Sequence, residues 1–297
     1  MDHADVTAAA GRIAPYARRT PLLRAEVDGR PVVFKLEHLQ LSGSFKLRGA
    51  LNALLGGELP AHVVTASGGN HGAAVATAAR LLGVPATVFV PEAVPAAKAA
   101  RIEAAGAKLV RHGAGYAEAA RAALAEAGSA GALYVPAYDH PLVVAGQGTC
   151  AAEVVAEAPD VDAVVVAVGG GGLAAGSALT GLPVFAVEPT RCRSLHDALA
   201  AGQPVDSPTD SVAASALGAT RVGELPFDVL RAAGARSVLV DDGAILAARD
   251  RLWDEFRLAV EPAAAAPFAA WLGGDITAEV PALVLCGANS DWKSAGA

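Results

Sequence analysis

The chain has 297 residues and a formal net charge of −7, from 23 Lys and Arg against 30 Asp and Glu. Apolar residue types make up 53% of it and charged types 18%, which excludes an intrinsically disordered chain. The length suffices for one large domain or two of ordinary size. The acidic balance argues against a nucleic-acid partner, because no basic stripe is present to contact phosphates.

Cysteine usage and apolar runs bear on where the protein works. Cys150, Cys192 and Cys286 are too few and too scattered for a disulfide framework, so we expect a reducing compartment. The N-terminal segment lacks a basic region followed by an apolar run, so no signal peptide is expected. No apolar run reaches the roughly 18–20 residues of a membrane span. A cytoplasmic protein without a membrane partner is the resulting expectation.

Short apolar strands alternate with Ala-rich helices along most of the chain. In chain order the predicted strands are 62–66, 86–91, 108–112, 132–136, 162–169, 183–189, 237–240 and 281–287. The predicted helices between them are 70–83, 95–106, 115–128, 143–158, 172–180, 242–257 and 262–272. This alternation predicts an α/β fold of βαβ units with two parallel sheets. The segment 202–226 lacks the pattern and is predicted to run over the surface.

Lys46 is the most unusual of the five lysines in the sequence. It lies between Phe45 and Leu47 in the segment LSGSFKLRGA, after a Gly/Ser turn and at the expected start of a helix. A partly desolvated lysine has a lowered pKa and becomes a nucleophilic amine for carbonyl chemistry. An exposed helix lysine with its stem packed on Phe45 explains this segment equally well.

Two Gly-rich turns follow predicted strands and open helices. In TASGGNHGAA, Ser67, Gly68 and Gly69 leave main-chain N–H groups free for an anion, and Asn70 adds a polar side chain. An ordinary turn with an Asn cap is the alternative. The tetraglycine 169–172 favours close approach to a phosphate. It departs from the G-x-G-x-x-G spacing, so a dinucleotide is the weaker interpretation.

Cys286 ends the last predicted strand, in LVLCGANSD. A core cysteine is the commoner fate of such a residue, and a thiol contacting a ligand is the alternative. Lys46 supplies a nucleophilic amine, the Ser67–Asn70 turn an anion site and the tetraglycine a phosphate site. Together they indicate a site for a phosphorylated aldehyde cofactor.

Seven runs of sequence, in this order along the chain, carry a family resemblance. They are GSFKLRGA, SGGNHG, GQGT, VGGGGLAAG, VEP, EPAAA and CGANSD. The chain resembles the fold-type II pyridoxal-phosphate (PLP) enzymes, in the group of threonine/serine dehydratases (ammonia-lyases) and serine racemases. The resemblance implies two open, twisted, mostly parallel sheets flanked by helices, as in the tryptophan synthase β fold. It also implies a large PLP-binding domain (1–60 and 137–297), a small domain (61–136) and a homodimer.

The resemblance also implies roles for single residues. Lys46 would form the Schiff base with PLP and later move protons, and Ser67 would act with it in catalysis. Phe45 would lie beside the cofactor, and Asn70 would contact its phenolic oxygen. The glycines that would bind the phosphate are Gly169, Gly170, Gly171 and Gly172.

The remaining implied contacts involve the substrate and the cofactor ring. The residues expected to hold the substrate carboxylate are Ser67, Gly69, Asn70 and His71, although a histidine at a helix start more often points away. Cys286 would face the pyridine nitrogen, and a thiol should not keep that nitrogen fully protonated. Glu261 in EPAAA would help to order the site; a helix-start carboxylate is its alternative interpretation.

Three features of this sequence are more similar to the dehydratase branch of the family than to its other branches. The racemase branch has a serine as second base where this chain has Gly68. Ser194, with Glu188 and Cys192, resembles the cation site of liver-type serine dehydratases, which implies potassium in preference to magnesium. Cys286 is the third such feature. Ala288 replaces the usual second glycine of the last motif, which would narrow the site.

The resulting hypothesis is β-elimination of water from L-threonine or L-serine, giving a 2-oxo acid and ammonia. Dehydration of 3-hydroxyaspartate and residual racemisation on the same scaffold stay open. A non-catalytic PLP-fold protein that binds a metabolite or partner is a third hypothesis, and the presence of Lys46 argues against it.

Overall fold

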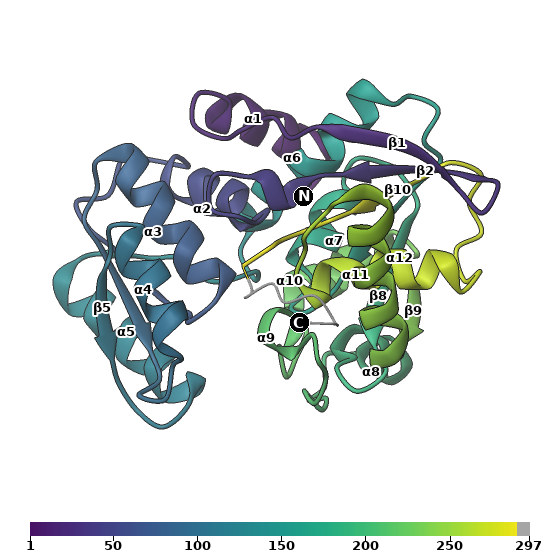
Figure 1. Cartoon of the computed structure of the whole chain (residues 1–297). Coiled ribbons are helices and arrows are strands. Elements are labelled where there is room, and N and C mark those ends of the chain that lie inside the picture. The colour runs from purple at the N-terminus through teal and green to yellow at the C-terminus, as the bar shows by residue number, and fades with distance from the viewer. Residues whose placement is uncertain (290–297) are drawn as a thin grey trace.

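The computed structural model describes residues 1–289 and contains two sheets, each flanked by helices (Figure 1). The larger sheet has the strand order β1-β2-β10-β7-β8-β9. Its strands are β1 (Leu22–Val27), β2 (Arg30–Lys35), β7 (Ala163–Ala167), β8 (Val184–Pro189), β9 (Arg236–Val240) and β10 (Pro281–Val284). All its pairings are parallel except that of β1 with β2.

The smaller sheet is wholly parallel and has the order β5-β4-β3-β6. Its strands are β3 (Val63–Ala66), β4 (Ala86–Val90), β5 (Lys108–Arg111) and β6 (Leu133–Tyr134). Each strand that the sequence pattern predicts is present, and the predicted α/β fold with two mostly parallel sheets is confirmed.

The helices fall between the strands as the alternation requires. Those of the first half are α1 (His3–Ile13), the 3-10 turn η1 (Glu37–Leu39), α2 (Lys46–Leu54), α3 (Asn70–Leu82), α4 (Ala96–Ala104), α5 (Tyr116–Ala130) and α6 (Pro141–Glu157). Those of the second half are α7 (Gly172–Ala178), α8 (Ser194–Ala201), α9 (Ala214–Leu217), α10 (Glu224–Ala232), α11 (Asp242–Phe256) and α12 (Pro262–Leu272). None of the helices in residues 1–289 combines the length and apolar character needed to cross a membrane.

The β1–β2 hairpin is the one sheet element that strand patterning did not predict. Its turn residues Asp28 and Gly29 both have positive φ, 52° and 72°, as a type I′ turn requires. The Asp-Gly pair between two short apolar runs was therefore the available sequence signal. The hairpin joins the parallel strands through β2, whose Phe34 pairs with Leu283 of β10.

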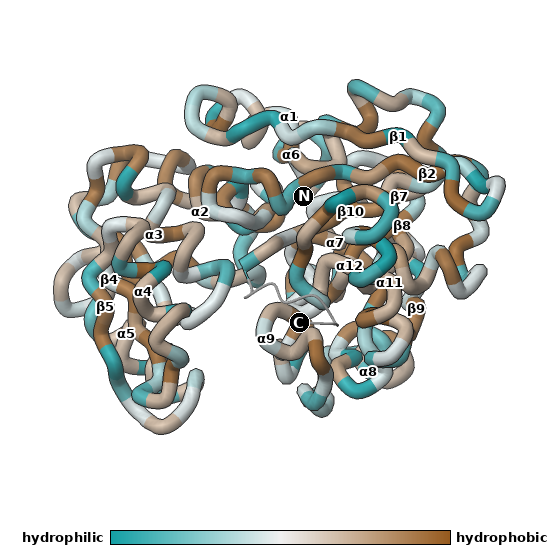
Figure 2. Tube along the Cα trace, in the orientation of Figure 1, coloured by the Kyte–Doolittle hydropathy of each residue, from teal (hydrophilic) through white to brown (hydrophobic). Residues whose placement is uncertain are grey.

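Each sheet has its own hydrophobic core, but the core of the smaller sheet draws on distant segments. Leu47 and Leu51 of α2, and Ile13 at the end of α1, pack into one cluster with α3 and the smaller sheet. In the larger sheet, the Ala and Val residues of β7 are all buried, and Figure 2 shows this strand as hydrophobic. The division into domains at 60/61 and 136/137 stays a prediction, and α2 lies where the two layers meet (Figure 1).

The segment 202–226 does not simply run over the surface, contrary to expectation. It contains α9 and the start of α10, and Ala213, Leu217 and Val222 are buried in the core of the larger sheet. The reason is the adjacent glycine turn at 169–172, which has no side chains of its own. A Cβ on Gly171 would lie 3.0 Å from Val222 Cγ2, so this segment supplies the apolar cover there.

Candidate active site

Lys46 is the first residue of α2, and contacts on both sides of it fix its place. The preceding N–H of Phe45 donates to the carbonyl of Cys286 at 3.0 Å, which ties the start of the helix to the end of β10. Lys46 Nζ donates to the carbonyl of Ala137 at 2.8 Å. Burial lowers the pKa of this amine to about 8. A substantial fraction of it is therefore neutral, and able to attack a carbonyl, in mildly alkaline solution.

The SGGN turn connects the carboxyl end of β3 to α3. Ser67 Oγ accepts from the N–H of Gly69 at 3.2 Å, and Asn70 is the first residue of the helix. Asn70 Nδ2 donates to Glu261 Oε1 at 2.6 Å. Glu261 precedes α12 and is 3% exposed, and burial raises its pKa. Glu261 was expected to help order the site, and in the structure its carboxylate fixes the position of the Asn70 side chain.

His71 is buried beneath this turn. Its Nε2 lies 3.0 Å from both Thr65 Oγ1 and the carbonyl of Val135. Burial lowers the pKa of the imidazole to about 3, so the ring is neutral throughout the physiological range. His71 also lines the outer cavity described below, and its predicted contact with substrate stays a prediction.

The tetraglycine connects β7 to α7. Within residues 1–289, the N–H groups of Gly169 to Gly172 donate to no protein acceptor. Gly171 has a φ of 90°, which favours glycine. An array of unpaired main-chain donors free of side chains suits a phosphate group.

Tyr138 forms one wall of this glycine turn, and sequence reasoning did not find it. A Cβ on Gly170 would lie 2.2–2.3 Å from ring atoms of Tyr138, and a Cβ on Gly172 would lie 3.1 Å from its Cβ. The available signal was its place just after β6, because ligand sites in parallel sheets lie beyond the carboxyl ends of strands. The protein's own packing against Tyr138 thus favours glycine at positions 170 and 172.

Cys286 follows β10 and is 4% exposed. Burial raises the pKa of its thiol well above the usual range, so the sulfur is protonated at any physiological pH. It faces the same small cavity as Phe45, Lys46 and the glycine turn. Of the last motif, Ser290 and Asp291 lie outside the described residues.

Two adjoining cavities collect these side chains. The inner one, about 40 Å³, is lined by the glycine turn, Phe45 and Cys286 among others. The outer one, about 510 Å³, is lined by the SGGN turn, the start of α4 and the segment 214–220 among others. The residues that line both cavities are Lys46, Asn70, Tyr138, Gly170 and Ala216. The structure therefore brings together predicted site residues that are far apart in the sequence, such as Lys46 and Cys286, 240 positions from each other.

The residues present fit a phosphorylated aldehyde cofactor. A partly buried amine with a lowered pKa is available for its carbonyl carbon. The unpaired N–H groups of the glycine turn are available for its phosphate. Phe45 and Tyr138 supply aromatic walls, and the neutral thiol of Cys286 lies in the same cavity.

The three residues of the predicted cation site lie together beside the glycine turn. Glu188 accepts from the N–H groups of Leu195 and His196 at 2.8 Å each. Ser194 Oγ donates to the carbonyl of Gly169 at 2.9 Å. Cys192 Sγ lies 3.1 Å from the carbonyl of Leu217. In the described part of the chain, no three His, Cys, Asp or Glu side chains gather as a metal-binding group.

Comparison with known proteins agrees with this geometry. The sequence model of the family described as "Pyridoxal-phosphate dependent enzyme" matches residues 13–287. The chain is 38% identical to an L-threonine ammonia-lyase of Geobacter sulfurreducens, over 95% of this chain and 74% of that protein. It is 34% identical to an L-threo-3-hydroxyaspartate ammonia-lyase of Saccharomyces cerevisiae, over 98% of this chain and 94% of the relative.

Solved structures give the same result. The crystal structure of a threonine deaminase from T.th. superposes with a TM-score of 0.92 at 36% identity. The match covers 99% of this chain and all of that chain. The fold is thus shared with this threonine deaminase along nearly the whole length of both chains.

Proposed function

Because this chain belongs to the pyridoxal-phosphate-dependent enzyme family, we propose that it deaminates L-threonine, L-serine or both to a 2-oxo acid and ammonia. The predicted resemblance, fold and class of enzyme are confirmed by the family match and the ammonia-lyase relatives. The observation that carries the proposal is the Lys46 amine, which has a pKa lowered to about 8 and shares a cavity with the unpaired N–H groups of the glycine turn.

The chain's own residues divide the work of the reaction. PLP held in this site would withdraw electrons from the α-carbon of a substrate whose amine has displaced the Lys46 amine from the cofactor, which leaves Lys46 free. The Ser67–Asn70 turn at the start of α3 holds the substrate carboxylate by main-chain N–H groups and side-chain donors. The free amine of Lys46 accepts the α-proton, and the β-hydroxyl leaves with a proton as water. The released unsaturated amine then takes up water, yielding the 2-oxo acid and ammonia.

Two residues favour elimination over racemisation. Racemisation needs a second acid/base on the opposite face, and Gly68 has no side chain there. A Cβ at this position would lie 2.9 Å from Val94 Cγ2, so Val94 occupies the space that a second base would need. The neutral Cys286 thiol, facing the ring nitrogen, would not keep that nitrogen protonated. We therefore expect no measurable D-serine from L-serine.

The test is turnover with a panel of β-hydroxy amino acids, with and without potassium or magnesium. We expect 2-oxo acid from L-threonine or L-serine, and none from D-serine. If only L-threo-3-hydroxyaspartate is turned over, L-threonine and L-serine are not the substrates and 3-hydroxyaspartate takes their place. Lys46→Ala should abolish product formation and borohydride trapping of PLP, whereas Lys108→Ala, at an exposed site on β5, should leave both unchanged. Trapping on a residue other than Lys46 would contradict the proposal.

The cation, the assembly and the location belong to the same proposal. Activation by potassium through Glu188, Cys192 and Ser194 is supported by their proximity to the glycine turn.

A homodimer is tested by light scattering of the PLP-loaded protein. A cytoplasmic location is supported by three free cysteines, Cys150, Cys192 and Cys286, all of them buried.

A further inference from the structure

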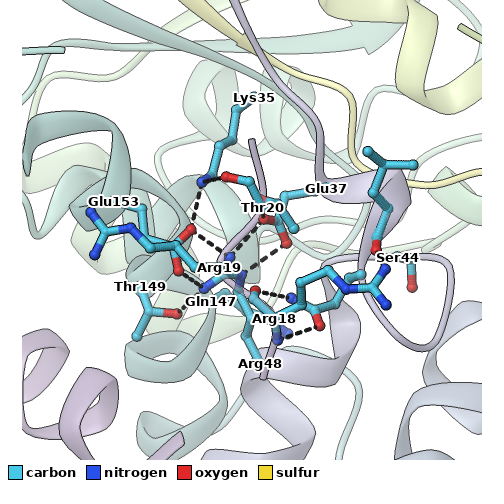
Figure 3. Close-up of polar contacts among 12 residues, drawn as sticks. Arg18, Arg19, Thr20, Lys35, Glu37, Ser44, Arg48, Gln147, Thr149 and Glu153 are labelled. Carbon is cyan, nitrogen blue, oxygen red and sulfur yellow. Dashed lines mark hydrogen bonds and ion pairs between the residues drawn. The ribbon is translucent and has the colours of Figure 1, made fainter. Parts of the chain in front are cut away.

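A cluster of buried charged side chains lies under the first turn of α2 and lines neither cavity. It comprises Lys35 of β2, Glu37 of η1, Arg48 of α2 and Glu153 of α6, and we call it the Arg48 cluster (Figure 3). Lys35, Glu37 and Arg48 are at most 1% exposed, and the side chain of Glu153 is 17% exposed. Two positive and two negative charges balance one another in it.

The guanidinium of Arg48 uses every N–H donor it has. It donates to Glu37 from Nε at 2.8 Å and from Nη2 at 2.7 Å. It donates to Glu153 from Nη1 at 2.7 Å and from Nη2 at 2.9 Å. Its last contact is from Nη1 to Thr149 Oγ1 at 3.1 Å. These bonds form a fork on each carboxylate, and a lysine, with three donors on one atom, cannot reproduce that geometry.

The helix that carries Arg48 rests closely on α6. A Cβ on Gly49 would lie 2.4 Å from Gln147 Nε2, and a Cβ on Gly146 would lie 2.7 Å from the carbonyl of Arg48. Two glycines thus allow the helices to touch along their backbones. Because Glu153 belongs to α6, its bonds with Arg48 set the rotation of α2 about its own axis relative to α6.

No side chain caps the start of α2, whose first residue is Lys46, two positions before Arg48. Leu47, between them, packs into the core of the smaller sheet. The preceding N–H of Phe45 is bonded to Cys286, which fixes the chain on one side of Lys46. Arg48 fixes it on the other side.

We propose that Arg48 is a positioning residue, which holds the first turn of α2 so that Lys46 Nζ points at the carbonyl carbon of the cofactor. The inference rests on the proposed function, in which Lys46 is the reacting amine. Stability alone does not account for the cluster, because buried ion pairs are often no more stabilising than apolar residues of similar volume. Misplacement of a reacting group by about 1 Å can lower a rate by about a hundredfold.

The test compares two substitutions within the cluster. Arg48→Lys keeps the positive charge and removes the fork. Lys35→Met removes a buried charge whose contacts are Glu153 and the carbonyl of Thr20, neither of them on α2. For each PLP-loaded variant we would measure kcat, KM, the thermal midpoint, the visible band of Lys46-bound PLP and the fraction trapped there by borohydride.

We expect Arg48→Lys to lower kcat by about 10- to 100-fold, with KM within about threefold, and to reduce the trapped fraction. Lys35→Met should lower the thermal midpoint while kcat of the folded enzyme stays within about threefold of wild type. Thr149→Val leaves one N–H of Arg48 without its acceptor and should lower kcat by about five- to tenfold, outside the threefold range allowed to the control. This milder variant carries the test if Arg48→Lys does not fold.

Two results would overturn the inference. One is a kcat loss in Lys35→Met equal to that in Arg48→Lys, because the cluster would then act only through stability. The other is a wild-type kcat and visible band in Arg48→Lys, or in Thr149→Val where that variant carries the test. Failure of the wild-type protein to trap PLP on Lys46 would instead contradict the proposed function itself.

Discussion

At the scale of single residues, burial sets the protonation state of the groups around the two cavities. It lowers the pKa of Lys46 to about 8 and that of His71 to about 3, and it raises that of the Cys286 thiol. Each of these pKa shifts favours the neutral form of its group, because burial removes the water that would stabilise the charged form. The site thus presents a neutral imidazole, a neutral thiol and an amine that titrates near neutrality.

The amine of Lys46 should therefore govern how the cofactor-free protein captures PLP as pH changes. Only the neutral amine attacks an aldehyde, and its fraction rises with pH through a pKa of about 8. We expect the capture rate, followed by visible absorbance, to reach half its maximum near pH 8. A rate still rising steeply above pH 10, as for an unperturbed lysine, would contradict this prediction.

Glu261 offers a second residue-scale prediction through its bond to Asn70. Glu261→Gln retains an oxygen that can accept from Asn70 Nδ2, so kcat/KM should change by less than about threefold. Glu261→Ala leaves that donor without its partner, which costs about 1–3 kcal/mol, and kcat/KM should fall by about tenfold or more. Equal losses in both variants would show that the carboxylate charge matters and the hydrogen bond does not.

At the scale of elements, the turn between β7 and α7 is shaped from both sides. Tyr138 packs against Gly170 on one side, and Val222 and Pro226 lie against Gly171 on the other. The turn therefore has little room to move, and its N–H groups are held in place before a ligand arrives. Such preorganisation lowers the cost of binding.

Gly170→Ala should weaken PLP binding, since the added Cβ would meet the Tyr138 ring at 2.2–2.3 Å. Overpacking of this kind costs about 1–3 kcal/mol, so we expect the dissociation constant to rise about tenfold or more. The double variant Gly170→Ala/Tyr138→Ala should bind more tightly than Gly170→Ala alone.

A matched control is Gly128→Ala in α5, where an added Cβ meets nothing within 4 Å. It should leave PLP affinity unchanged and stabilise the helix by about 0.5–1 kcal/mol. Unchanged affinity in Gly170→Ala would show that the ring of Tyr138 moves aside freely.

At the scale of the whole molecule, the site is assembled from both sheets. The SGGN turn follows β3 of the smaller sheet, while the glycine turn and Cys286 follow β7 and β10 of the larger one. Arg101 of α4 donates to the carbonyl of Asn289 at 2.8 Å, a further link between the two layers. A ligand bound among these elements should therefore stabilise both layers together.

We expect PLP at a concentration of about 100 times its dissociation constant to stabilise the folded protein by about 2.7 kcal/mol. For a chain of this length that corresponds to a rise of several degrees in the thermal midpoint, followed by far-UV circular dichroism. Lys46→Ala should show a smaller shift, because it loses the covalent link. Two separate thermal unfolding transitions, with PLP raising the midpoint of only one, would contradict a site shared by both sheets.

The sequence by itself determined the α/β class, most strand positions and the set of residues proposed to carry the chemistry. Strands and helices leave local periodic patterns, and the lysine, the SGGN turn and the tetraglycine are contiguous segments whose chemistry can be read directly. The β1–β2 hairpin was also within reach, through its Asp-Gly turn.

Only the tertiary structure decided how distant side chains support that chemistry. The bond between Asn70 and Glu261 joins residues 191 positions apart, and Arg48 meets Glu153 across 105 positions. The place of Tyr138 after a predicted strand indicates the ligand side of the sheet, but no local pattern in it or in the segment 202–226 shows that either packs against the glycine turn. Such contacts depend on which surfaces the chain brings together, and no periodicity of a single segment encodes that.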